Sequence, residues 1–148
     1  MQLLLAAQLP RKLGGLGGSA VYISTESRLP QPRLQQLALE HPTLHAHFKS
    51  DGENDPCKHL LLKSAHTPDE LGFVLNQLPL LLAQEQHSPH PIRLVVVDSI
   101  AFHFRHDFDD MALRTRLLNG MAQTFIQLAV THKLAVSNIK SVKLKVLQ

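Results

Sequence analysis

The chain has 148 residues, of which 44% are hydrophobic and 5% are aromatic. This length fits one domain at most, and the hydrophobic fraction is sufficient for a core. The net charge of +3 permits a nucleic-acid partner without arguing for one. The single Cys57 excludes an internal disulfide, and no apolar run approaches the ~18 residues of a membrane span.

Residues 2–9 are expected to form a helix that ends at Pro10 and the glycine-rich residues 14–18. This helix begins without a capping residue, so we interpret the start of the chain as cut. The glycines nearly fit a dinucleotide-binding fingerprint. They precede a strand instead of following one, so a flexible helix-to-strand connection is the better interpretation.

Residues 20–26 are expected to form an apolar strand that ends in a carboxylate, and a short helix should follow over 32–41. The polar residues 42–58 are expected to be a mobile surface loop, and 59–63 a further strand. Thr67, Pro68 and Glu70 are typical of the N-cap, N1 and N3 positions of a helix. Pro79 should kink or end that helix near Leu78.

Residues 92–99 hold the clearest pattern in the chain. The four aliphatic residues at 94–97 predict a strand that is buried on both faces, as in a parallel sheet. Asp98 follows at the sheet edge where α/β proteins bind ligands. P-loop NTPases place the acid that holds Mg²⁺ at such a position. The alternative is an Asp that only suits the turn.

A long helix is expected from about residue 109 to residue 132, and a fourth strand begins at 134–136. Residues 137–148 could be an amphipathic strand or a tail outside the fold. The alternation of strands and helices predicts right-handed crossovers. The expected fold is therefore an α/β three-layer αβα sandwich with a mostly parallel sheet, with a core at 1–136 and a divergent tail at 137–148.

Several segments together resemble the ATPase core of RecA-like recombinases, which are P-loop ATPases. The similarity is greatest to the eukaryotic DNA-repair recombinase paralogues that act as mediators. Residues 2–10 look like the helix after the phosphate loop, and residues 20–26 like the strand with the catalytic glutamate. The match continues at 29–37, at 93–99 (the Walker B strand) and at 101–119, where Phe-Arg-His-Asp at 104–107 is similar to the paralogue branch.

The resemblance implies a role for each matching residue. Glu26 would orient the water that attacks the γ-phosphate, and Asp98 would hold Mg²⁺ through water. Gln2 would flank the nucleotide-binding phosphate loop. The DNA-binding residues, at the first DNA-facing loop, would be Arg105, Arg114 and Arg116. The alternatives are a strand-end acid for Glu26 and a solvated helix face for the arginines.

The sequence departs from the family pattern at both ends. Met1 stands where the Thr or Ser of the phosphate loop would be, and residues 137–140 replace the expected aliphatics and Asn-Gln pair. We therefore expect a core that is incomplete at both ends. ATP and Mg²⁺ would be cofactors of the full-length parent, whereas this chain would bind neither tightly and would not be a competent ATPase.

The implied function is DNA repair by homologous recombination, as a paralogue that assists filament assembly on single-stranded DNA in the nucleus. The implied partners are single-stranded DNA, another paralogue as heterodimer partner and the main strand-exchange recombinase, with no membrane. The alternatives are a non-catalytic protein-interaction module and an inactive gene-model fragment that does not fold stably. A zinc site is weakly supported, because no His pair lies beside Cys or a carboxylate at a ligand spacing.

Overall fold

The structure is a computed structural model that describes residues 1–26, 31–50, 55–100 and 110–139. The strands are β1 (Ser19–Ser24), β2 (Leu60–Ser64), β3 (Ile92–Asp98) and β4 (Ala135–Ile139). The α-helices are α1 (Gln2–Gln8), α2 (Gln31–Glu40), α3 (Pro42–Ser50), α4 (Pro68–Gln84) and α6 (Met111–His132), with 3₁₀ turns η1 (Arg11–Leu13) and η2 (Glu85–His87). Within the described residues, no helix has the length and apolar character needed to cross a bilayer.

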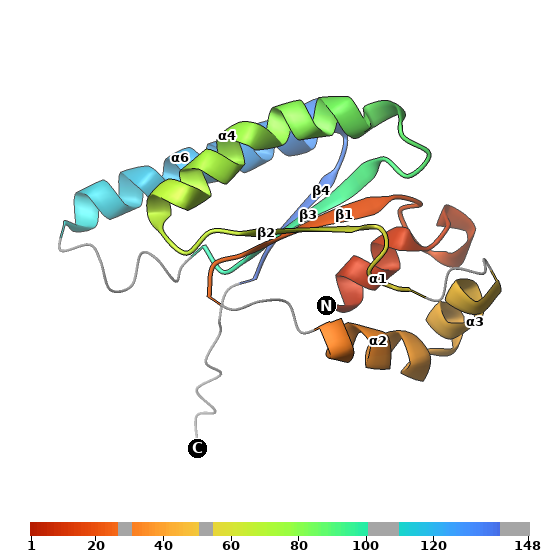
Figure 1. The fold of residues 1–148 in the computed structure, drawn as a ribbon. Helices are drawn as coiled ribbons and strands as arrows, with labels where there is room; N and C mark the ends of the chain where they lie inside the picture. The colour runs from red at the N-terminus through yellow and green to blue at the C-terminus, as the bar shows by residue number, and fades with distance from the viewer. Residues whose placement is uncertain (27–30, 51–54, 101–109, 140–148) are drawn as a thin grey trace, which may run out of the picture.

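The four strands form one parallel sheet in the order β2-β1-β3-β4. Helices α1, α2 and α3 cover one face of the sheet, and α4 and α6 cover the other (Figure 1). This arrangement confirms the predicted α/β three-layer fold. The predicted boundary at residue 136 falls inside β4, and residues 140–148 lie outside the described part.

Alternate residues of each central strand point to opposite layers, as the two-residue period of a strand requires. Val21 and Ile23 pack in the cluster that includes α4 and α6, whereas Ala20 and Tyr22 pack in the cluster that includes α1, α2 and α3. All six residues of β1 are buried. A strand that is buried on both faces has the near-continuous apolar sequence seen here.

Helix α3 occupies residues that were expected to be a loop, so that prediction is wrong for 42–50. Leu44 and Phe48 lie four positions apart and therefore on one side of the helix. Both are buried, and they pack in the same cluster as Leu34 of α2. This burial stabilises a helix whose remaining residues are mostly polar.

Helix α4 begins as predicted but does not end near Leu78. The Thr67 hydroxyl accepts a hydrogen bond from the Glu70 N–H at 3.2 Å, which confirms the N-cap. The helix continues through Pro79 to Gln84. Leu71, Leu75, Leu78 and Leu82 form a continuous buried face against the sheet. This packing on both sides of the proline outweighs the hydrogen bond that proline cannot donate.

The glycine-rich residues connect α1 and η1 to β1, which confirms the predicted helix-to-strand connection. Gly14 has φ +83° at the end of η1, a conformation that favours glycine. A Cβ on Gly18 would lie 2.2 Å from the Pro91 carbonyl oxygen and 2.6 Å from Cγ of Arg93. Glycine therefore lets the chain enter β1 directly beside the start of β3.

Candidate functional site

The sequence-predicted acids both lie at the carboxyl edge of the sheet, at the ends of neighbouring strands. Strands β1 and β3 are neighbours at its centre, and Ser24 is paired with Asp98. From β1 the chain moves outward to β2, and from β3 it moves outward in the opposite direction to β4. Such a switch point leaves a crevice beyond the carboxyl ends of the two strands, where open α/β sheets bind ligands. Glu26 follows β1 by two residues and is exposed at this edge.

Asp98 is held by a side chain from the neighbouring strand. The Tyr22 hydroxyl donates a hydrogen bond of 2.8 Å to Oδ2 of Asp98. Burial raises the pKa of Tyr22 well above its usual range, and the hydrogen bond to Asp98 and the negative charges of Asp98 and Glu26 raise it further. Tyr22 therefore remains a donor at neutral pH and fixes the orientation of the Asp98 carboxylate.

Tyr22 was not among the predicted site residues. The one available signal was that the only tyrosine of the chain lies in an otherwise aliphatic strand. Its partner is 76 positions away in sequence, so their contact depends on the strand order and not on any local pattern.

Thr25 fastens the end of β1 to the end of β3. Its backbone N–H donates to the Asp98 carbonyl oxygen at 2.8 Å, and its Oγ1 accepts from the Ser99 N–H at 2.8 Å. The same hydroxyl lies 3.0 Å from the carbonyl oxygen of Ser99. Thr25 is only 1% exposed. The backbone that carries the two acids is thus fixed from both strands.

The donor set at this edge fits Mg²⁺ bound mainly through water and phosphate. Asp98 offers one carboxylate, and the buried Oγ of Ser99 has no hydrogen-bond partner among the described residues. Mg²⁺ is commonly held by one or two carboxylates and keeps several waters. The described residues contain no group of three or more His, Cys, Asp or Glu side chains placed to hold a metal ion. A site built only from protein ligands is therefore not formed by them.

Gln2 is exposed in the first turn of α1, on the layer that also contains Tyr22. The last turn of α1 lies beside the start of β1, because the Gly18 N–H donates to the Ala7 carbonyl oxygen at 3.1 Å. The first turn consequently lies toward the carboxyl end of the strand (Figure 1). The structure thus directs the start of α1 toward the edge that carries Asp98.

The predicted DNA-binding arginines are not brought together on one surface of the described structure. Arg114 and Arg116 lie near the start of α6, where Asp110 caps the helix by accepting from the Ala112 and Leu113 N–H groups. Arg114 is half-buried and donates to Sδ of Met111 at 3.8 Å, whereas Arg116 is exposed. Residues two apart in a helix point to different sides, so these two do not share a face. Arg105 lies outside the described residues.

Comparison with known proteins gives a consistent family. The Rad51 family profile matches residues 1–146. The DNA repair protein RAD51 homolog 3 of Cricetulus griseus is 39% identical over 149 residues, with 92% of this chain and 40% of the relative covered. The DNA repair protein XRCC3 homolog of Arabidopsis thaliana is 31% identical over 92% of this chain and 46% of its own. The DNA repair protein RAD57 of Saccharomyces cerevisiae is 33% identical, with 92% of this chain and 29% of the relative covered. The chain thus spans less than half the length of each of these relatives.

Proposed function

This chain belongs to the Rad51 family, and we propose that it serves DNA repair by homologous recombination as a RecA-like recombinase paralogue. Its task would be to assist assembly of the recombinase filament on single-stranded DNA. The observation that carries the proposal is that Asp98 ends β3 at the switch point of a parallel sheet, beside β1, whose last residue Glu26 follows by two positions. The relatives named above, which are DNA repair proteins, support the same role.

The site residues have separate tasks in this proposal. Asp98, oriented by Tyr22, would hold Mg²⁺ through water, and the exposed Glu26 would orient a water molecule. Bound Mg²⁺ would neutralise charge on the phosphates of ATP. Residues 1–148 contain no Gly-Lys-Ser or Gly-Lys-Thr segment. We therefore expect these residues to bind ATP weakly by themselves.

Hydrolysis measurements test this part of the proposal. The purified chain should release phosphate from ATP and Mg²⁺ at the background rate, because the Lys and backbone amides of a phosphate loop are not among its residues. The Glu26→Gln variant should give the same rate. Mg²⁺-dependent hydrolysis by the chain that is lost in Glu26→Gln would contradict the expectation.

The partners proposed are single-stranded DNA, a second paralogue as heterodimer partner and the main strand-exchange recombinase, with action in the nucleus. The test is filament assembly by the recombinase of the same organism on single-stranded DNA, with and without the purified chain. The chain should accelerate assembly. The double variant Arg114→Gln/Arg116→Gln should reduce the acceleration, whereas Arg33→Gln, an exposed arginine on α2, should not. No acceleration by the folded chain would count against the proposal.

A second candidate function is a non-catalytic protein-interaction module. It is favoured by a groove between α6 and β4 whose described lining residues all have apolar side chains, among them Ile126, which is 57% exposed. The groove is lined by Ile100, Leu118, Ala122, Phe125, Ile126, Ala129 and Val136. Apolar surface of this kind marks contact sites. Because no charged side chain lines the groove, the occupant we propose is an apolar segment of a second recombinase paralogue.

Capture by an immobilised paralogue tests whether the groove is the contact. For the interaction module, capture should be insensitive to salt and nucleotide, and Ile126→Ser should weaken it. Leu80→Ser is the matched control, since Leu80 is 65% exposed but lies on α4 away from the groove. Equal weakening by both variants, or capture that salt abolishes, would exclude the groove as the contact.

A further inference from the structure

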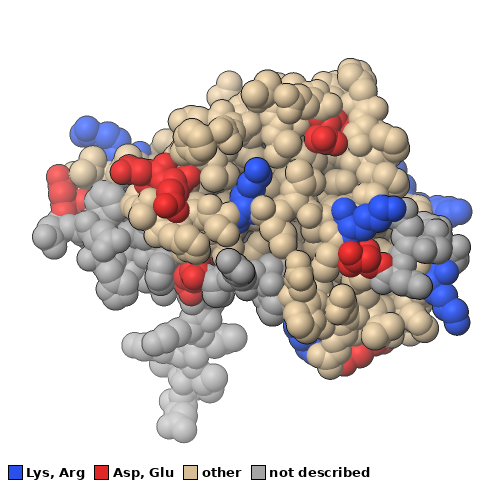
Figure 2. Space-filling model, viewed as in Figure 1, with Lys and Arg blue, Asp and Glu red and all other residues tan. Residues whose placement is uncertain are grey.

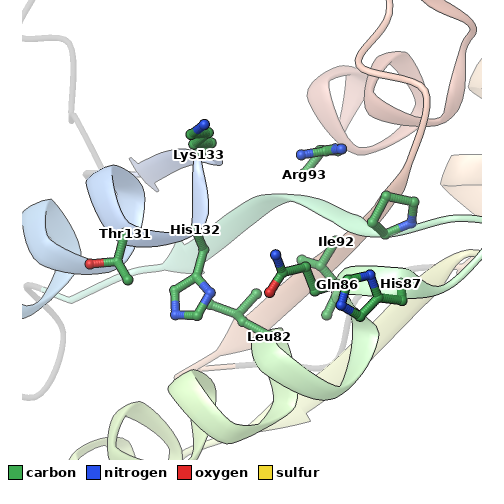
Figure 3. A pocket seen from close by; sticks show the side chains of 9 residues that line it. Leu82, Gln86, His87, Ile92, Arg93, Thr131, His132 and Lys133 are labelled. Atoms are coloured by element: carbon green, nitrogen blue, oxygen red, sulfur yellow. The ribbon is translucent and has the colours of Figure 1, made fainter.

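The amino edge of the sheet contains a cavity of about 250 Å³ that plays no part in the proposed function. Figure 3 shows its walls, which come from η2, the start of β3 and the end of α6. Its polar lining consists of Gln86, His87, Arg93, Thr131, His132 and Lys133. Among the residues that the structure describes, no Asp or Glu lines the cavity. The lining therefore combines two permanent cations, two imidazoles and two neutral polar groups with no counter-charge among them.

Arg93 is the unusual member of this group. It is half-buried in β3, and its side-chain stem lies over Gly18, where a Cβ would come within 2.6 Å of Cγ. No hydrogen bond or ion pair joins its guanidinium to any residue that the structure describes. A partly buried cation without a counter-charge is unfavourable. An anion bound in the cavity would supply the missing counter-charge for Arg93.

A simpler explanation covers part of the cluster. His132 and Lys133 follow the last turns of α6, and His87 ends η2 directly after α4. Cations are stabilised at helix C-termini by the helix dipole. Arg93, however, lies on a strand, so no helix end accounts for its position. The dipole explanation therefore leaves unexplained the residue with the greatest capacity to bind an oxyanion.

We propose that this cavity, here called the amino-edge pocket, binds a phosphate group. The Arg93 guanidinium would pair with two phosphate oxygens through its planar fork, and Lys133 would supply a second positive charge. Gln86 offers a further hydrogen-bond donor, whereas Thr131 points away from Arg93 in Figure 3. The phosphate could belong to a free phosphate ion or to the backbone of a nucleic acid, since both present the same oxygens.

The amino-edge pocket is separate from the acidic site. Arg93 is the second residue and Asp98 the last residue of the strand β3, and the five residue steps between them extend about 16 Å. The two sites also have opposite charge, so one ligand atom cannot serve both. The inference therefore does not rest on the proposed function, and either can fail without the other.

Titration calorimetry of the full chain tests the proposal, with inorganic phosphate as one probe and a single-stranded oligothymidylate as the other. Arg93→Met keeps the apolar stem over Gly18 but removes the charge, and it should weaken binding at least about tenfold. Lys133→Asn removes one positive charge and should weaken binding about threefold. Asn is chosen because it accepts the left-handed conformation that Lys133 adopts at φ 52°. Circular dichroism would confirm that each variant is folded.

Arg11→Gln is the matched control, since Arg11 is an exposed cation that precedes β1 and does not line the pocket. Phosphate binding that Arg93→Met abolishes and Arg11→Gln preserves would support a free-phosphate site. Oligonucleotide binding that Arg93→Met abolishes and Arg11→Gln preserves, with no binding of free phosphate, would support a site for the phosphates of a nucleic-acid backbone. Binding of neither probe, or equal weakening by Arg93→Met and Arg11→Gln, would overturn the proposal.

Discussion

The two edges of the sheet differ in how their charged side chains are held. At the carboxyl edge, Tyr22 orients the Asp98 carboxylate and Thr25 joins the ends of β1 and β3. At the amino edge, Arg93 and Lys133 make no hydrogen bond or ion pair with the rest of the described chain through their side chains. In the view of Figure 2, acidic side chains lie over the beginning of α4, whereas Lys and Arg side chains lie at both ends of the molecule, with acidic side chains among those near α1 and α3.

The edge with the cationic cluster is therefore not the edge at which charged side chains are held in place. At the carboxyl edge, the Asp98 carboxylate and the Ser99 N–H are positioned by Tyr22 and Thr25 of the neighbouring segment. At the amino edge, the close approach of Gly18 to Pro91 and the hydrogen bond from the Ser19 hydroxyl to the His90 carbonyl oxygen constrain the chain, but neither holds a charged side chain. At the carboxyl edge, removing a hydrogen-bonding side chain should therefore lower stability. At the amino edge, the larger loss should come from replacing a glycine that the backbone requires.

The largest expected effect is that of Gly18→Ala at the amino edge. The new Cβ would overlap the Pro91 carbonyl oxygen, which is backbone and cannot move aside as a side chain does. We expect the free energy of unfolding to fall by about 3 kcal/mol in urea denaturation. Gly120→Ala in α6 is the control, because its Cβ meets no atom within 4 Å and alanine favours helices. Equal effects of the two substitutions would show that this edge is not constrained by its backbone.

Thr25→Val should give the next largest effect, at the carboxyl edge. The variant keeps the shape of the side chain but leaves the Ser99 N–H without its acceptor in a buried position. A loss of about 2 kcal/mol in the free energy of unfolding is expected. Thr124→Val removes an exposed hydroxyl that bonds the Gly120 carbonyl oxygen, and it should cost less than about 0.5 kcal/mol. A loss as small as this for Thr25→Val would contradict the described fastening of β1 to β3.

Tyr22→Phe should cost about 1 kcal/mol at pH 7, because Asp98 loses its hydrogen bond. The pKa of Tyr22 is raised in the folded chain, so above pH ~10 the unfolded chain loses the phenolic proton first. The stabilisation from Tyr22 is therefore complete below pH ~10 and decreases as the pH rises further. Urea denaturation at pH 7 and pH 11 should show a smaller difference between wild type and variant at pH 11. A constant difference would be inconsistent with the raised pKa.

Arg93→Met should have the smallest effect on stability. Its guanidinium has no partner among the described residues, and methionine preserves the contact of the stem with Gly18. The free energy of unfolding should change by less than about 0.5 kcal/mol in phosphate-free buffer. Thermal unfolding in an uncharged buffer provides the measurement. A loss of more than about 1 kcal/mol would show that the amino-edge charges are held as firmly as those at the carboxyl edge.

The sequence was sufficient where the stabilising interactions are local. The Thr67–Glu70 cap and the aliphatic run of β3 are both formed by neighbouring residues, so their patterns predicted the elements correctly. The helix over 42–50 was missed because two buried residues, Leu44 and Phe48, decide its formation through contacts with other helices. The passage of α4 through Pro79 has the same origin, since packing against the sheet overrides a local preference.

In the candidate site, too, features that depend on local sequence could be predicted and features that depend on strand order could not. Asp98 and Glu26 could be predicted as site residues because Asp98 ends a recognisable strand and Glu26 follows another. The contact of Tyr22 with Asp98 could not, because it depends on β3 lying beside β1 instead of beside β2. The amino-edge pocket is likewise formed by segments whose proximity only the strand order determines.

The place of β1 at the centre of the sheet also affects how the chain is synthesised. The Thr25 and Ser99 residues that fasten β1 to β3 are 74 positions apart. At ribosomal rates, roughly 4–15 s pass between the synthesis of these two residues. During that interval one edge of β1 has no strand to pair with, and unpaired apolar edges are prone to aggregate. Until β3 has emerged, the growing chain should therefore be more prone to aggregation at this edge than the finished fold.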